Sequence, residues 1–115
     1  MSVTIWHNPR CSKSRQTLEL LRERNIKPVI VEYLEHPPSE KSLRQVLGLL
    51  GLKPRELMRT GESEYSDNGL SNPALTDHEL IAAMLRMPRL IERPVVLANG
   101  KAAVGRPPES VLEIL

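Results

Sequence analysis

The chain has 115 residues, 40% of them apolar, and a net charge of +2. This length is typical of one domain, so we expect a single domain over residues 1–115. The small charge, with one Trp, two Tyr and no Phe, argues against nucleic acid as the main partner and indicates a monomer. Because we find neither an apolar run of about 20 residues nor a signal-peptide pattern, we expect a cytoplasmic protein without a membrane partner.

The amino-terminal third predicts a strand, a helix and a second strand. The β-rich run 3–6 is broken by His7–Arg10, and a helix is expected to begin near Cys11. The run Pro28–Leu34 is almost continuously apolar, which is typical of a strand covered on both faces. Strand, helix and strand in this order imply a parallel pair.

The middle of the chain is expected to be helical. Ser39 is placed as the N-cap of a helix that ends near Gly51, and a shorter helix follows from Pro54. The polar, turn-rich stretch 60–73 predicts a long surface loop. The capping box Thr76–Glu79 then begins another helix.

The carboxyl-terminal part predicts a hairpin and a last helix. Asn99-Gly100, between the apolar runs 94–98 and 101–104, is a strong hairpin signal, and a helix follows from Pro107. The complete order, β-α-β-α-α-α-β-β-α, is that of a thioredoxin-like α/β fold. We therefore expect a mixed four-stranded sheet flanked by helices.

Cys11 is the only cysteine, and it lies where a strand gives way to a helix. The first backbone amides and the positive end of the helix dipole favour a thiolate there. Arg10, Lys13 and Arg15 add positive charge, so the site could also hold an oxyanion beside the sulfur. The alternative is a buried, inert cysteine.

Residues near Cys11 narrow the chemistry. A phosphatase-type loop needs an arginine six residues after the cysteine, where this chain has Thr17, and a dithiol site needs a cysteine where it has Ser14. An oxidised Cys11 must therefore be resolved by an outside thiol. His7 could polarise the thiolate or could be a plain packing residue. No histidine has metal-ligand spacing, so no metal site is expected.

Arg59, Arg93 and Arg106 stand out by their context. Arginine binds tetrahedral oxyanions through two parallel hydrogen bonds, which is why a site for such anions would use several. In a thioredoxin-like fold, the X-Pro pair that enters the third strand lies opposite the active cysteine, so Arg93 should face Cys11. The alternative for each arginine is a solvated surface position.

Four segments, taken together, resemble the ArsC family of glutaredoxin-coupled arsenate reductases, and the match spans the chain. These segments are His7–Arg15, Glu56–Arg59, Glu92–Val96 and Gly105–Glu109. The resemblance implies a thioredoxin-like fold with a helical insertion and a cis proline at Pro94. It also implies that Cys11 is the nucleophile and that Arg59, Arg93 and Arg106 bind the oxyanion. We expect supporting roles for His7, Ser14, Arg15 and Pro94.

The resemblance further implies a reaction in which Cys11 displaces water from arsenate and glutathione attacks the adduct. Arsenite then leaves, and glutaredoxin clears the disulfide between Cys11 and glutathione. Glutathione would be a co-substrate, with no bound cofactor. Two alternatives stay open. One is an Spx-like regulator that binds RNA polymerase, although Ser14 breaks its usual Cys-x-x-Cys. The other is a glutathione-dependent thiol reductase without arsenate activity.

Overall fold

The structure, a computed structural model, describes residues 2–115. The chain divides into two compact units. The first unit holds the chain up to His36 together with Arg93–Leu115, and the second is the continuous segment Pro37–Glu92. Over the described residues, no helix is long and apolar enough to cross a membrane.

The first unit is built on a mixed four-stranded sheet of order β2-β1-β3-β4. β1 pairs with β2 in parallel and with β3 antiparallel, and β3 pairs with β4 antiparallel. The α/β class and the mixed sheet expected from the sequence are therefore confirmed. The elements of this unit are β1 (Val3–Trp6), α1 (Ser12–Glu23), β2 (Val29–Val31), β3 (Val95–Ala98), β4 (Lys101–Val104) and the 3-10 helix η3 (Pro108–Ile114).

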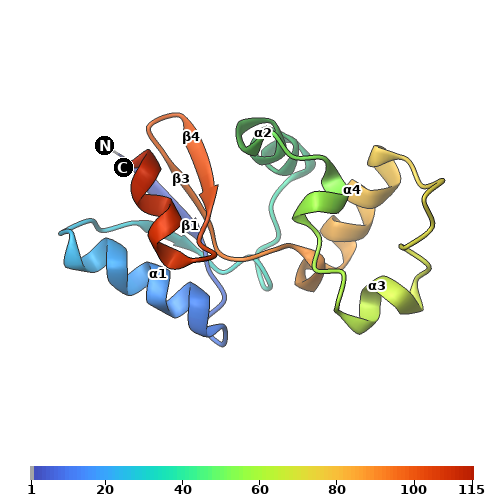
Figure 1. Cartoon of the computed structure of the whole chain (residues 1–115), viewed down its shortest axis with the longest axis horizontal. Helices are drawn as coiled ribbons and strands as arrows, with labels where there is room; N and C mark the ends of the chain where they lie inside the picture. Colours follow the sequence, from blue (N-terminus) through green and yellow to red (C-terminus); the bar gives the residue numbers. More distant parts are fainter. Residues whose placement is uncertain (1) are drawn as a thin grey trace. The chain divides into compact units, whose positions relative to one another are not determined.

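One face of this sheet carries a hydrophobic core. The side chains alternate along β1 and β3, and the register pairs Val3 with Ala98 and Ile5 with Val96, so all four point to the same face. α1 and η3 lie side by side over that face (Figure 1). The buried members of this core are Val3, Ile5, Leu18, Leu21, Val96, Ala98, Val111 and Ile114.

β2 differs from its prediction. The apolar run Pro28–Leu34 was expected to be a strand covered on both faces, but the strand is only Val29–Val31 and lies at the edge of the sheet. Val29 is 57% exposed and Ile30 is 42% exposed. The prediction was wrong because an apolar run does not specify how many strands and helices will lie beside it.

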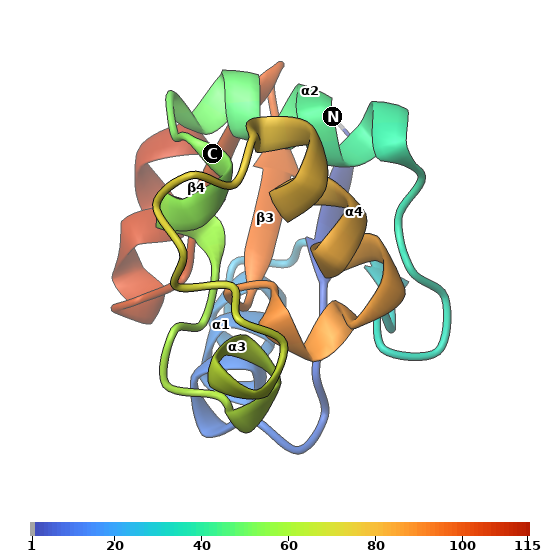
Figure 2. The ribbon, with the colours of Figure 1, turned by 90° about the vertical axis from the view of Figure 1, so that its right-hand side faces the viewer.

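The second unit is helical, as an insertion between β2 and β3 should be. In Figure 2, α4 lies next to α2, and the two helices are in contact. The elements of this unit are α2 (Glu40–Leu50), the 3-10 turn η1 (Pro54–Leu57), α3 (Ser63–Asp67), α4 (Asp77–Arg86) and the 3-10 turn η2 (Pro88–Leu90).

The helix ends of the second unit follow the capping rules. The Ser39 hydroxyl accepts a hydrogen bond from the Ser42 N–H at 3.1 Å, and Gly51 ends α2 in the left-handed conformation with φ 67°. At α4, the Thr76 hydroxyl accepts from the Glu79 N–H at 3.2 Å, and the Glu79 carboxylate accepts from the Thr76 N–H at 3.1 Å. These predicted boundaries are confirmed.

The stretch 60–73 is more ordered than a surface loop. It contains α3, and Tyr65 and Leu70 within it are buried. Arg55 donates hydrogen bonds to the Tyr65 hydroxyl at 2.6 Å, to the Leu70 carbonyl, and to the Asn72 carbonyl at 2.9 Å. The loop prediction was wrong because these contacts reach 10 to 17 residues along the chain, beyond any local sequence signal.

The hairpin is confirmed, and the last helix differs in type. Asn99 and Gly100 have φ 55° and 70°, the pair of positive angles that a two-residue type I′ turn requires. The helix that follows is the 3-10 helix η3, which ends one residue before Leu115.

Candidate active site

Cys11 is the N-cap residue of α1, and its side chain is partly exposed. The turn that delivers it is held by two hydrogen bonds to Asn8: the Cys11 N–H donates to the Asn8 carbonyl and the Arg10 N–H to the Asn8 side-chain oxygen, both at 3.0 Å. The sulfur is thereby placed at the end of the helix where the backbone N–H groups have no carbonyl partner within the helix.

The surroundings of Cys11 favour its thiolate. Burial raises the pKa of the thiol, but the backbone N–H groups of Ser14 and Lys13 and the guanidinium of Arg93 together lower it below the ordinary cysteine value. Arg93 acts both through its charge and through a side-chain hydrogen bond. A larger fraction of Cys11 is therefore ionised near pH 7 than for an ordinary cysteine.

His7 and Ser14 tie the turn to the helix. The Ser14 side chain is fully buried, and its hydroxyl accepts from the Asn8 N–H at 3.0 Å and lies 2.6 Å from Nδ1 of His7. Burial lowers the pKa of His7, with Glu32 opposing the effect and Arg22 and Arg15 adding to it. The contact between His7 and Ser14 means that His7 supports the turn, as a packing residue would.

Arg15 has a partner that the sequence did not suggest. Its Nη1 donates to the Pro9 carbonyl at 2.9 Å, across the turn that precedes Cys11. The residue is exposed. Arg15 thus supports the turn that precedes Cys11.

Arg93 and Arg106 are placed by a close approach of the backbone at Gly105. A Cβ at Gly105 would lie 2.5 Å from the Thr17 hydroxyl and 2.8 Å from Cγ of Pro94, so only glycine fits there. The Gly105 N–H donates to the Pro94 carbonyl at 2.9 Å, and the Arg106 guanidinium donates to the Arg93 carbonyl at 3.4 Å.

The peptide bonds Arg93–Pro94 and Arg106–Pro107 are both cis. The first of these is the cis bond that the family resemblance implied at Pro94. Arg93 and Arg106 each come directly before one of these bonds, in the unit that also holds Cys11. The structure thus brings Arg93 to Cys11 and Arg106 to the backbone of Arg93.

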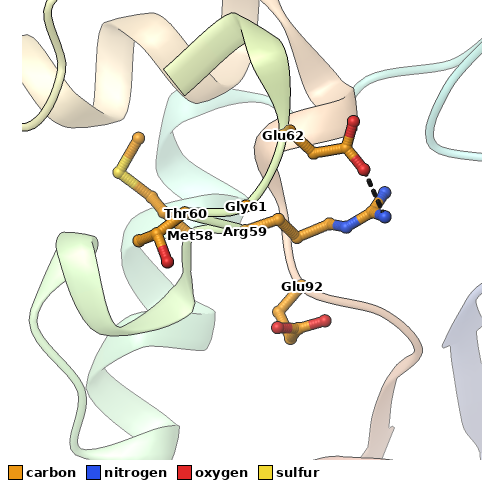
Figure 3. Close-up of a pocket in the computed structure, with 6 residues that line it drawn as sticks. All are labelled: Met58, Arg59, Thr60, Gly61, Glu62 and Glu92. Atoms are coloured by element: carbon orange, nitrogen blue, oxygen red, sulfur yellow. Dashed lines mark ion pairs between the residues drawn. The ribbon is translucent and has the colours of Figure 1, made fainter. Parts of the chain in front are cut away.

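Arg59 belongs to the second unit, where it follows η1. Figure 3 shows its side chain reaching to the carboxylate of Glu62, with which Nη2 forms an ion pair. Its backbone N–H donates to the Leu90 carbonyl at 2.7 Å, and its Nη1 donates to the Arg89 carbonyl at 3.4 Å. The backbone and the side chain of Arg59 therefore both bond to residues of the second unit.

The first unit thus presents an activated thiolate beside a guanidinium. Such a pair can attack an electrophilic centre that carries anionic oxygens, because the sulfur supplies electrons while the guanidinium binds the oxygens. Within residues 2–115, no group of three His, Cys, Asp or Glu side chains lies close enough to hold a metal ion.

Sequence reasoning missed Glu62 as the partner of Arg59. Its spacing of three residues is the one signal that could have indicated the pair, since side chains three apart meet on a helical turn. It also missed Arg55, whose contacts to Tyr65 and Leu70 depend on how the following segment folds back.

Comparison with known proteins identifies the family of this chain. Residues 6–114 match the model of the ArsC family. The chain belongs to the ArsC family. The matched range covers Cys11, the three arginines and both cis peptide bonds.

Individual ArsC relatives are similar over almost their whole length. YfgD of Escherichia coli K12, an uncharacterized protein, is 53% identical over 114 residues, which cover 98% of this chain and 96% of the relative. An arsenate reductase of Neisseria meningitidis is 48% identical, with 98% and 97% covered. The solved structure of an arsenate reductase from Vibrio cholerae has a TM-score of 0.97 at 51% identity, covering 100% of this chain and 98% of that one.

Proposed function

We propose that this protein is an arsenate reductase that uses glutathione and glutaredoxin, with Cys11 as its nucleophile. The observation that carries the proposal is the position of Cys11 as the N-cap residue of α1, with the Arg93 guanidinium beside it. Relatives named arsenate reductase, including the one at 48% identity, supply the substrate class.

In the proposed reaction, the Cys11 thiolate attacks arsenate, a sulfur–arsenic bond forms, and one arsenate oxygen leaves as water. The thiolate of glutathione then attacks the Cys11 sulfur. The sulfur–arsenic bond breaks and leaves its electron pair on arsenic, which falls from the +5 to the +3 state and leaves as arsenite.

Cys11 is then in a disulfide with glutathione. Glutaredoxin and a second glutathione reduce this disulfide, and glutathione disulfide is released. An outside thiol is needed because the sequence has one cysteine. Two glutathione molecules thus supply the two electrons that arsenate takes up.

The arginines have separate parts in this proposal. Arg93, which lies beside Cys11, stabilises the thiolate and binds an arsenate oxygen, and Arg106 contributes a second guanidinium from the neighbouring turn. Arg59 is the third oxyanion-binding arginine, on the strength of the family resemblance. Arginine suits this task because its planar fork matches two oxygens of a tetrahedral anion.

The test is arsenate-dependent NADPH consumption in the presence of glutathione, glutathione reductase and glutaredoxin. The wild-type protein should reduce arsenate. The activity of Cys11→Ser should fall to background, because a serine hydroxyl is not ionised near neutral pH. The neighbouring exposed position supplies a control: Ser12→Ala should keep its activity.

Two outcomes contradict the proposal. Turnover that survives in Cys11→Ser would remove Cys11 as the nucleophile. A folded wild-type protein with a reactive Cys11 but no arsenate turnover would remove arsenate as the substrate. Disulfide exchange without arsenate would then favour the thiol reductase, and retention by the RNA polymerase α subunit would favour the regulator.

A further inference from the structure

Arg59 borders a cavity of about 380 Å³ in the second unit. The cavity is also lined by the segment that follows Arg59 and by one residue near the end of the unit (Figure 3). The lining residues are Met58, Arg59, Thr60, Gly61, Glu62 and Glu92. Arg59 thus borders a space that a small ligand can enter, although its side chain is only 19% exposed.

The Arg59 guanidinium is held from two sides. Nη2 pairs with one carboxylate oxygen of Glu62, and Nη1 donates to the carbonyl of Arg89 at 3.4 Å. A guanidinium has five N–H groups, so these two contacts fix its orientation and leave N–H groups for an oxyanion. The Glu62 side chain is 17% exposed, and a backbone bond of 3.2 Å from its N–H to the Arg59 carbonyl closes the same turn.

The second carboxylate oxygen of Glu62 is also used. It lies 3.3 Å from Nη2 of Arg89, whose Nε is 3.4 Å from Glu64. Glu62 is therefore fixed by a second cation, and its position does not depend on Arg59 alone. Glu62 forms ion pairs with both Arg59 and Arg89. Glu64 forms its ion pair with Arg89, and Arg59 acts on it through its charge.

From this arrangement, the structure assigns Glu62 as the positioning residue for Arg59: it holds the guanidinium ready for the oxyanion. The inference rests on the proposed function, in which Arg59 binds arsenate. An arginine side chain has many rotamers, and a guanidinium fixed before the substrate arrives does not have to be ordered during binding.

Replacing Glu62 tests the assignment. Glu62→Ala should raise the KM for arsenate about ten-fold with a smaller change in kcat, since it loosens a group that binds the substrate. Glu62→Gln keeps an oxygen that can accept from Arg59, so its KM should lie between those of wild type and Glu62→Ala. Glu64→Ala is the matched control, and its KM should stay at the wild-type value.

A KM that falls or stays constant in Glu62→Ala would overturn the assignment. A fall would mean that the carboxylate competes with arsenate for Arg59. Equal KM values for Glu62→Ala and Glu64→Ala would overturn it too, because loss of the Arg89 contacts would then explain both. The alkylation rate of Cys11 should be the same in all variants, which checks that the first unit is intact.

A second measurement is independent of turnover. The Nε–Hε resonance of Arg59 in an NMR spectrum of the full chain should be sharp and resolved in wild type and in Glu64→Ala. It should move to the position of mobile arginines in Glu62→Ala. If the resonance behaves in this way while wild type does not reduce arsenate, the proposed function fails and the positioning role stands; an unchanged resonance in Glu62→Ala removes that role.

Discussion

The two units hold their functional groups by different means. In the first unit, the charge on Cys11 is favoured by backbone N–H groups at the start of a helix together with the Arg93 guanidinium. In the second unit, Arg59 is oriented by the side chain of Glu62. A backbone group survives most substitutions, whereas a carboxylate is lost in one. The ionisation of Cys11 should therefore withstand most substitutions around it other than that of Arg93, whereas the orientation of Arg59 should be lost when Glu62 is replaced.

The largest expected effect is that of replacing Arg93, whose side chain lowers the pKa of Cys11. Arg93→Ala should lower kcat/KM for arsenate about 100-fold, a magnitude typical of losing one preorganised donor to an anionic transition state. It should also raise the pKa of Cys11, measured as the midpoint of the alkylation rate against pH. Without Arg93, only the Ser14 and Lys13 N–H groups oppose the effect of burial on this pKa.

Arg93→Lys serves as the control for charge. It keeps the positive charge but not the fork, so it should restore part of the pKa shift and little of the arsenate binding. A midpoint that does not move in Arg93→Ala would show that the backbone alone sets the ionisation of Cys11.

Replacing a glycine by alanine should change the free energy of unfolding in opposite directions in the two units. Gly105→Ala places a Cβ against Thr17 and Pro94, and it should reduce the free energy of unfolding by about 1–3 kcal/mol. Gly48→Ala lies inside α2 with open space around it, and it should increase stability by about 0.5–1 kcal/mol. Urea unfolding measures both. A neutral Gly105→Ala would mean that the backbone near the arginines gives way easily.

A smaller effect is expected at the cap of α4. Thr76→Ala removes the hydroxyl that accepts from the Glu79 N–H, and it should cost about 1 kcal/mol in urea unfolding. Thr76→Ser keeps the hydroxyl and should stay close to wild type. If both variants lose the same stability, the methyl group and not the cap is responsible.

The smallest effect concerns pH. The pKa of His7 in the folded protein is lower than the ordinary value of 6.5, so the unfolded chain binds the proton more readily. The free energy of unfolding should therefore fall as the pH drops below 6.5, by at most about 1.4 kcal/mol per pH unit. His7→Gln should flatten this dependence between pH 7.5 and 5.5. If the free energy of unfolding depends on pH equally in wild type and in His7→Gln, the assigned role of His7 in this dependence is wrong.

The parts of the fold that could be predicted from the sequence are those set by near neighbours. The capping box of Thr76 and Glu79, the left-handed Gly51 and the Asn99-Gly100 turn each involve residues within a few positions of one another. The position of Cys11 as the N-cap of α1 is of the same kind, and so it was predictable.

The remaining features depend on contacts across the fold. The exposure of Val29 follows from β2 lying at the sheet edge, and the order of α3 follows from Arg55 reaching Tyr65. In the candidate site, the sequence indicated that Arg15 contributes positive charge. Its hydrogen bond to the Pro9 carbonyl forms only once the turn before Cys11 has folded, so the sequence did not indicate it. The packing of the folded chain determines such partners, and no local sequence pattern indicates them.

The close approach at Gly105 also limits how this sequence can drift over evolutionary time. A lineage that replaces this glycine first needs a smaller residue at position 17, because the Thr17 side chain fills the space that a new Cβ would take. The opposite order passes through a clash. Even after that change, Pro94 closes the other side of the space, so the glycine is retained for as long as this proline holds its place.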